Sequence, residues 1–256
     1  MTTDKNILVR PLEDCAVLIT GGTSGIGLAS ARALAEAGVR RFVLNGRNAE
    51  RAEAAHRSLA ETAPEADIRL ALGDAATQDG ARGAVAATTD AFGHIDVLVN
   101  SAGGDILPKL LHETDMDEIE SVLQGELLST ILPTRAALDP MMAQRGGSII
   151  AIASDAAKVA TPGEAVIGAA LAGILMFTRT AAMEAKRSGV CLNCITPSIV
   201  RGTSHYDKLM ADGFAGRLFC QGRKPRQLGR RRSGGPGASR GLLGQPGSRQ
   251  TERSGD

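Results

Sequence analysis

Short aliphatic runs alternate with helical patterns along most of this 256-residue chain, and this alternation constrains the fold more than any other feature. Six runs have the length and composition of buried strands: Cys15–Thr20, Arg41–Asn45, Ile68–Leu72, Ile95–Asn100, Ser148–Ser154 and Val190–Thr196. Helical patterns fill the intervals: a helix up to Ala37, Glu50–Thr62, near Gly80–Phe92, about 114–145 and about 163–188. Alternation of this kind specifies a parallel sheet covered on both faces, with right-handed crossovers. The sequence therefore predicts a doubly wound α/β domain.

The composition changes near residue 220. The last 36 residues, 221–256, carry nine Lys/Arg against two Asp/Glu and are rich in Gly, Ser, Gln and Pro, whereas residues 1–220 are mildly acidic. No period of 2 or 3.6 is visible in these last residues, and their composition is typical of a disordered segment. We therefore divide the chain into one domain, 1–220, and a basic Gly/Arg-rich tail, 221–256.

The tail begins abruptly, which is typical of GC-rich coding DNA read in a shifted frame, and we interpret it as derived from a frameshift. The alternative is a basic arm that binds nucleic acid or an acidic partner surface. That alternative is less favoured because the tail has no aromatic side chain on which a base could stack.

Cysteine, histidine and hydropathy patterns argue against several classes of protein. Cys191 and Cys194 lie three residues apart on an expected strand and would point to opposite faces, so we expect buried small side chains and not a functional dithiol. His56, His94 and His112 lack metal-ligand spacing, so no metal site is predicted. Without a signal peptide or an apolar run of 18–20 residues, we expect a soluble cytoplasmic protein with no membrane partner.

A glycine-rich turn joins the first strand to the first helix. It reads Thr20-Gly21-Gly22-Thr23-Ser24-Gly25-Ile26-Gly27. Glycines at such a turn let the backbone approach a pyrophosphate, which would lie on the helix N-terminus. Because the turn follows a strand and opens a helix, it indicates a Rossmann-like nucleotide site. In the alternative interpretation, the glycines are present only because the packing of the strand against the helix requires them, and no nucleotide binds there.

Several segments, in order, resemble the short-chain dehydrogenase/reductase family. They are the TGxxxGxG turn, Asp74 after the third strand, Asn100-Ser101-Ala102-Gly103, Ser154 after the fifth strand, and Asn193-Cys194-Ile195-Thr196-Pro197, where Ser198 replaces a glycine. The resemblance runs from about residue 12 to 219. It implies the fold of an NAD- or NADP-dependent oxidoreductase. It also implies that the chain assembles into a tetramer.

The resemblance also implies which residues would bind the cofactor. They are Gly21, Ser24, Gly25, Ile26, Gly27, Arg47, Asp74, Asn100, Ala102 and Gly103. No acidic residue follows the second strand, and Arg47 could pair with a 2′-phosphate, which slightly favours NADP over NAD. Alternatively Arg47 is a solvated residue at a helix start, and nucleotide binding has been lost.

The catalytic positions that the resemblance implies are largely replaced. The family's tyrosine, which moves the proton, and its lysine, four residues later, fall on Ile167 and Leu171, and residues 159–178 contain no Tyr or Lys. The family's asparagine falls on or near Glu126, which we interpret, with Lys158 and Glu164, as a solvated or helix-starting charge. Ser154 alone remains, as a residual catalytic residue. Tyr206 on the expected substrate lid is an alternative proton donor, although less favoured because proton transfer requires a held geometry.

These losses predict a non-catalytic subunit of a heteromeric NAD(P)-dependent hydroxyacyl-CoA, or other secondary alcohol, dehydrogenase. Its partner would be an active paralogous subunit, and the small-molecule substrate would bind at the partner's site. The alternatives are an active alcohol/ketone oxidoreductase with an atypical proton donor and a nucleotide-binding protein without turnover. The family's last helix and seventh strand cannot be recognised after residue 220, so an edge of the sheet would need a partner subunit to cover it.

Overall fold

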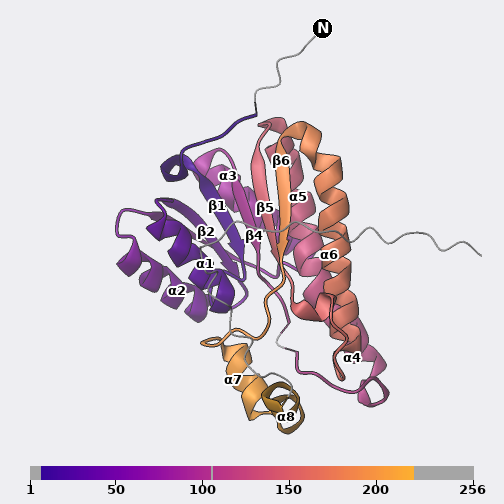
Figure 1. Cartoon of the computed structure of the whole chain (residues 1–256). Coiled ribbons are helices and arrows are strands. Elements are labelled where there is room, and N and C mark those ends of the chain that lie inside the picture. The colour runs from indigo at the N-terminus through magenta and orange to yellow at the C-terminus, as the bar shows by residue number, and fades with distance from the viewer. Residues whose placement is uncertain (1–6, 105, 222–256) are drawn as a thin grey trace, which may run out of the picture. The chain divides into compact units, whose positions relative to one another are not determined.

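The computed structural model describes residues 7–104 and 106–221. The predicted basic tail lies outside the described residues, apart from Gln221 at the end of the last helix. Within the described part, the chain alternates strands and helices from the first strand to the sixth (Figure 1).

A parallel sheet of six strands forms the centre of the fold. Its order is β3-β2-β1-β4-β5-β6, so the chain starts in the middle, moves to one edge and returns to build the other half. The strands are β1 (Ala16–Thr20), β2 (Arg41–Gly46), β3 (Asp67–Leu72), β4 (Val97–Asn100), β5 (Gly147–Ile152) and β6 (Val190–Ile195). The predicted doubly wound, Rossmann-like α/β domain is confirmed.

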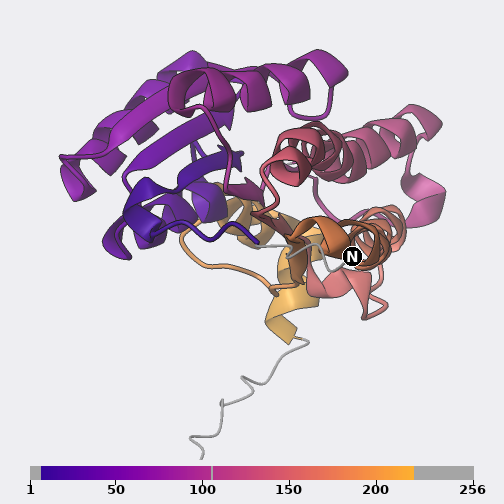
Figure 2. The ribbon, with the colours of Figure 1, turned by 90° about the horizontal axis from the view of Figure 1, so that it is seen from above.

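Helices cover both faces of the sheet (Figure 2). Helices α1 and α2 pack together on one face, and α3, α5 and α6 pack side by side on the other. The bounds are α1 (Gly25–Glu36), α2 (Ala49–Thr62), α3 (Gln78–Phe92), α4 (Met116–Leu123), α5 (Ser129–Ala143), α6 (Ala165–Ala185), α7 (Ser204–Ala211) and α8 (Gly213–Gln221). Short 3₁₀ turns lie at Leu12–Asp14 (η1), Leu111–Glu113 (η2), Asp155–Ala157 (η4) and Lys186–Ser188 (η5).

The helix expected over about 114–145 consists of three segments. Between α4 and α5 the backbone widens into a π-helical turn, η3 (Gln124–Leu128). Pro133 in the second turn of α5 has no N–H to donate to the preceding turn. Single π-turns within α-helices occur frequently at functional sites. This one contains Glu126.

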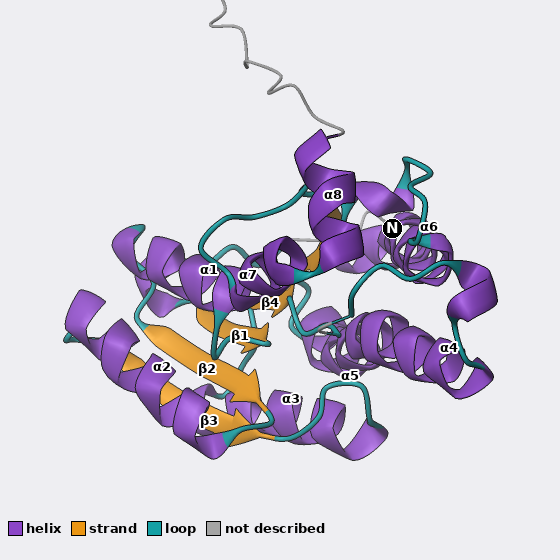
Figure 3. Ribbon diagram, turned by 90° about the horizontal axis from the view of Figure 1, so that it is seen from below, coloured by secondary structure: helices purple, strands orange, loops and turns teal. Residues whose placement is uncertain are grey.

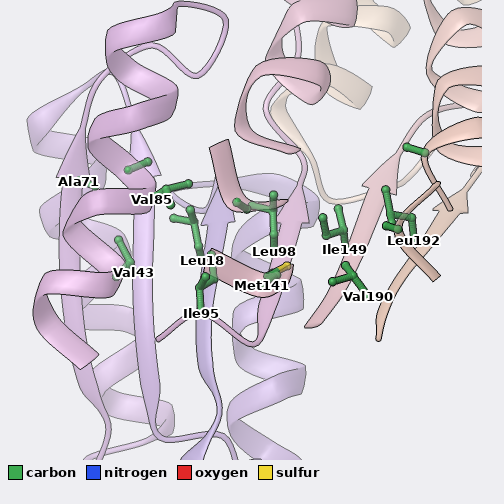
Figure 4. Packing of buried hydrophobic residues seen from close by; sticks show 14 residues of the cluster. Leu18, Val43, Ala71, Val85, Ile95, Leu98, Met141, Ile149, Val190 and Leu192 are labelled. Carbon is green, nitrogen blue, oxygen red and sulfur yellow. The ribbon is translucent and has the colours of Figure 1, made fainter. Parts of the chain in front are cut away.

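The core is built from aliphatic side chains that alternate between the two faces of the strands. Leu18, Leu98 and Ile149 face α3, α5 and α6 (Figure 4), whereas Val17 and Ile19 face α1 and α2. Because central parallel strands are covered on both faces, β1 is buried at every position. This explains how a chain with 2% aromatic residues fills a core of this size.

Two expectations from the sequence are wrong. Cys191 is exposed because no described segment covers its face of the edge strand β6, and Cys194, on the opposite face, is only half-buried against the cluster of Ala153 and Leu171. The second expectation was that no apolar segment reaches the 18–20 residues of a membrane span. The helical segment Ala165–Ser188 is long and apolar enough to cross a membrane, by length and composition alone. In the structure α6 packs along β6 as part of the helix layer (Figure 1).

Asp96, just before β4, links the beginnings of three strands. Its Oδ2 accepts a hydrogen bond from the backbone N–H of Ala16 at 2.8 Å, and its Oδ1 accepts one from Arg10 Nε at 3.1 Å. Its main-chain oxygen accepts from Ser148 N at 2.7 Å, and His94 Nε2 lies 3.1 Å from Oδ2. Asp96 therefore links the three strands: its carboxylate binds the start of β1, and its main-chain oxygen binds the start of β5.

We expect Asp96→Ala to lower the free energy of unfolding by about 2–4 kcal/mol, because it leaves a buried N–H and a nearby arginine without their acceptor. Urea denaturation of the full chain measures the change. The matched control is Asp67→Ala, which removes an exposed pair with Arg69 and should cost no more than about 1 kcal/mol. Equal losses in the two variants would contradict this role of Asp96.

Candidate functional site

The carboxyl ends of the central strands meet at one edge of the sheet, where doubly wound folds bind ligands. Thr20 at the end of β1 lies in register with Asn100 at the end of β4, and Asn100 with Ala151 of β5. The glycine turn, the segment after β4 and Ser154 after β5 are therefore neighbours. This brings together segments separated by more than 50 residues in the sequence.

The glycine turn adopts a conformation that its residues require. Gly21 and Gly25 have positive φ angles of 64° and 51°, which only glycine adopts readily. A Cβ on Gly27 would overlap the carbonyl oxygen of Gly21 and Ser101 Oγ, so α1 can approach the end of β1 only with glycine there. At Gly25, in contrast, the nearest atom to a Cβ would be Thr203 Cγ2 at 3.8 Å.

The start of α1 fits the pyrophosphate of a dinucleotide. The side chain of its N-cap residue, Ser24, makes no capping hydrogen bond, so it leaves the first-turn N–H groups of the helix to other acceptors. Such N–H groups and the helix dipole favour a bound phosphate. The residues predicted to hold the pyrophosphate thus have a suitable geometry, and their role stays a prediction.

Arg47 and Asp74, both predicted near the adenosine, pair with each other. Arg47 Nη1 lies 3.7 Å from Asp74 Oδ2, and the two side chains are 71% and 41% exposed. Asp74 Oδ1 also accepts a hydrogen bond from Ala76 N at 2.9 Å, which fixes the turn after β3. An exposed ion pair contributes little, so Arg47 can leave Asp74 for a 2′-phosphate at small cost.

The segment after β4 is held by polar contacts on both sides. Asn100 Nδ2 donates to Thr134 Oγ1 at 2.9 Å, and Ser129 Oγ donates to the carbonyl oxygen of Ala102 at 2.9 Å. Asn100 Oδ1 is buried and has no hydrogen-bond partner within the part of the chain that the structure describes. An unsatisfied buried acceptor at the edge of the sheet where doubly wound folds bind ligands is consistent with a ligand or water that donates to it.

Ser154, Ile167 and Leu171 lie around one apolar cluster. Ala153, which precedes Ser154, packs in a cluster with Leu171 and Ile174, and Ile167 packs against the same cluster. Leu171 is 5% exposed and Ile167 is half-buried. Ser154 Oγ donates weakly to Asp155 Oδ1 and accepts from Ala156 N, both at 3.3 Å. The structure thus brings Ser154, Ile167 and Leu171 together, but with hydrocarbon at the two helix positions.

The interpretation of Glu126 as a solvated charge is wrong. Its Oε1 accepts a hydrogen bond from Gly104 N at 2.7 Å, and its Oε2 would lie 3.2 Å from a Cβ on Gly103. Burial raises the pKa of Glu126 from 4.5 to about 7, against the opposing effect of the Gly104 hydrogen bond. The π-helical turn therefore aims a carboxyl group with a pKa near neutrality at the loop after β4.

Helices α7 and α8, which follow β6, cover the carboxyl end of the sheet next to α1 (Figure 3). Thr203, which caps α7, faces Gly25 of the glycine turn, and Phe214 of α8 packs against Gly163 before α6. Tyr206 lies half-buried on α7, within this cover. Lys158 is exposed and donates to Thr196 Oγ1 at 2.6 Å, and Glu164 lies at the N-cap of α6, which agrees with a helix-starting charge.

Replacement of Glu126 by Gln should change the pH dependence of stability. A carboxyl whose pKa is raised on folding stabilises the protein only while protonated, so its contribution is lost as the pH rises from about 4.5 through about 7. We expect Glu126→Gln to be more stable than the parent by about 1–2 kcal/mol at pH 8, after allowance for partial solvent access, with no such gain at pH 4. Urea denaturation at both values measures this.

The matched control for this experiment is Glu120→Gln. Glu120 is exposed on α4, so its replacement should leave the pH dependence of the parent unchanged. A Glu126→Gln variant that follows the parent at both pH values would show that folding does not raise the pKa of this carboxyl.

Comparison with known proteins shows what the chain is similar to. Residues 15–212 match the family model described as short chain dehydrogenase. A 3-oxoacyl-[acyl-carrier-protein] reductase from Synechocystis is 34% identical over 72% of this chain and 73% of its own length. The (2S)-[(R)-hydroxy(phenyl)methyl]succinyl-CoA dehydrogenase subunit BbsD from Thauera aromatica is 34% identical over 77% of both chains. The crystal structure of NAD⁺-bound xylitol dehydrogenase superposes with a TM-score of 0.75 at 25% identity, over 84% of this chain and 80% of that one.

Proposed function

The chain belongs to the short-chain dehydrogenase family, and from this premise we propose that it is a nucleotide-binding, non-catalytic subunit of a heteromeric NAD(P)-dependent dehydrogenase. Its active partner would be a paralogous subunit that oxidises or reduces a hydroxyacyl-CoA or another secondary alcohol. The observation that carries the proposal is the pair Ile167 and Leu171, which packs hydrocarbon beside Ser154 where the family has a proton donor and a cation.

The chemistry explains why these two replacements matter. Hydride transfer between an alcohol carbon and a nicotinamide requires that a proton leave or join the substrate oxygen. General acid–base groups contribute about a hundred- to ten-thousandfold to such steps. Neither isoleucine nor leucine has an ionisable group, and Ser154 is hydrogen-bonded only to its own turn in the described contacts. The proposal therefore assigns the proton transfer to the partner.

Nucleotide binding is proposed because the required backbone is intact. Gly21, Gly25 and Gly27 keep the conformation and close packing that let a phosphate approach α1. NAD(P), when bound, supplies a hydride acceptor or donor in this family. Arg47, once released from Asp74, would donate hydrogen bonds to a 2′-phosphate. This favours NADP over NAD.

An exposed apolar stripe on α6 supports the proposed partner. Ala169, Ala172 and Met176, the last 59% exposed, follow one another on one exposed face of the helix, and Met183, 69% exposed, lies on that face beyond Arg179 and Thr180. Contiguous exposed apolar side chains commonly mark protein–protein interfaces. A relative that is itself named a dehydrogenase subunit, BbsD, agrees with a multisubunit assembly. We propose that the assembly is a soluble cytoplasmic heterotetramer.

Native mass spectrometry after co-expression with neighbouring genes tests the proposal. We expect the full chain to be recovered with a homologous dehydrogenase, and the isolated chain to bind NADPH but to transfer no hydride with hydroxyacyl-CoA or secondary alcohols. An isolated chain that binds neither nucleotide nor a homologous subunit would contradict it.

The double variant Ile167→Tyr with Leu171→Lys tests the cause of inactivity. Restoring an acid and a cation should raise hydride transfer at least about a hundredfold above background. The control Ile167→Phe with Leu171→Met has similar size but no ionisable group and should remain inactive.

Glu126 supports a second candidate function, an active oxidoreductase with an atypical proton donor. A carboxyl group with a pKa of about 7 is suited to donate and accept protons at neutral pH. If this function holds, the unmodified chain turns over, its rate follows the titration of one group near pH 7, and Glu126→Gln abolishes it. An inactive parent chain excludes this alternative.

A further inference from the structure

A groove lies between α3 and α5, which pack against each other on one face of the sheet (Figure 3). Residues of the segments 78–89 on α3 and 132–140 on α5 line it, and its volume is about 670 Å³. This volume is within the usual range of small-molecule sites. No residue that lines it is among those predicted to bind a nucleotide or to occupy a catalytic position, so the groove is separate from the candidate site.

The floor of the groove is apolar, and small side chains keep it hollow. The lining positions recur every three or four residues, so each helix contributes one face. Ala81 and Val85 of α3 lie on this floor with Leu132 and Ala136 of α5. Because a helix rises 1.5 Å per residue, the lining segment of α3 gives the groove a length of about 16 Å. The shape therefore suits an elongated apolar body.

Two arginines lie on the walls of the groove, one from each helix. Arg82 of α3 is exposed and forms no ion pair within residues 7–104 and 106–221. Arg135 of α5 pairs with Asp139 at 2.9 Å, and these two side chains are 65% and 73% exposed. An exposed pair of this kind contributes little, so Arg135 can turn to a ligand at small cost. Two guanidinium groups against one carboxylate leave the lining with an excess of positive charge.

We propose that this groove binds a medium-chain carboxylate, an elongated apolar molecule with one anionic head group. The carboxylate accepts hydrogen bonds from Arg82 and Arg135, whose planar guanidinium groups match its geometry. The hydrocarbon chain lies along Ala81, Val85 and Ala136. The site requires neither NAD(P) nor an active partner, so its failure and the failure of the proposed function are separate outcomes.

Charge favours this occupant over two others. Residues 221–256 carry nine Lys/Arg against two Asp/Glu, so their sequence does not complement a positively charged groove. A second copy of the chain that presented the same groove about a two-fold axis would bring Arg82 and Arg135 toward arginines of the other copy. A small anion meets neither repulsion.

Isothermal titration calorimetry of the full chain with decanoate tests the proposal. We expect saturable binding of decanoate. Binding should be at least about tenfold weaker for acetate, which has the head group without the chain, and for decyltrimethylammonium, which has the chain with the opposite charge. A chain that does not bind decanoate, or that binds decyltrimethylammonium equally well, would overturn the proposal.

Two variants test whether decanoate binds in this groove. Arg82→Glu reverses the charge of one wall, and Ala136→Leu fills the floor with another strong helix former. Each should raise the dissociation constant of decanoate at least about tenfold. Because Arg82 is exposed, its variant should fold even if Ala136→Leu does not.

The matched control is Arg57→Glu, which reverses an exposed charge on α2, outside the groove. It should leave the affinity for decanoate unchanged. Decanoate binding that Arg82→Glu does not weaken, or that Arg57→Glu weakens equally, would place the ligand elsewhere and refute the site.

Discussion

The close approach of α1 to the end of β1 is the contact on which the whole candidate site depends. Gly27 lies against the Gly21 carbonyl and Ser101, with no room for a side chain. Ser101 in turn donates to the carbonyl oxygen of Thr20 at 2.8 Å. This contact fixes the start of α1 between β1 and β4 and aims its first N–H groups at the edge of the sheet. The segment at Thr203 then covers it from the other side.

The chemical half of the site is less constrained by the fold than the nucleotide half. Glycine at 27 is required by backbone contact, whereas the positions of Ile167 and Leu171 face a cluster that any apolar side chain of similar size can fill. In the proposed non-catalytic subunit, isoleucine and leucine stand there in place of the family's proton donor and its cation, and they add apolar burial beside Ala153. A non-catalytic chain of this family can therefore keep its fold and its nucleotide turn without strain.

The architecture could be predicted from the sequence because it depends on local periodicity. The six aliphatic runs and their intervening helices gave the doubly wound sheet, and the strand ends differ by only a few residues from those expected. The proximity of Ser154, Ile167 and Leu171 was anticipated from family spacing. The environment of Glu126 was not, because it arises from a π-helical turn and from the Gly104 N–H, which lies 22 residues away in sequence. Pro133, which cannot donate a helical N–H, is a local signal in the sequence for an irregular helix here.

The exposure of Cys191 was missed for a related reason. Alternation along a strand says which residues share a face but not whether another segment covers that face. Leu192 and Val190 are buried because α6 lies over them, whereas Cys191, Asn193 and Ile195 would be covered only by chain beyond the strand or by another molecule. The buried clusters on the two faces of the sheet are built from described residues between Val17 and Leu192. Completion of the core and completion of the sheet edge are therefore separate requirements, and in this chain only the first is met within the described residues.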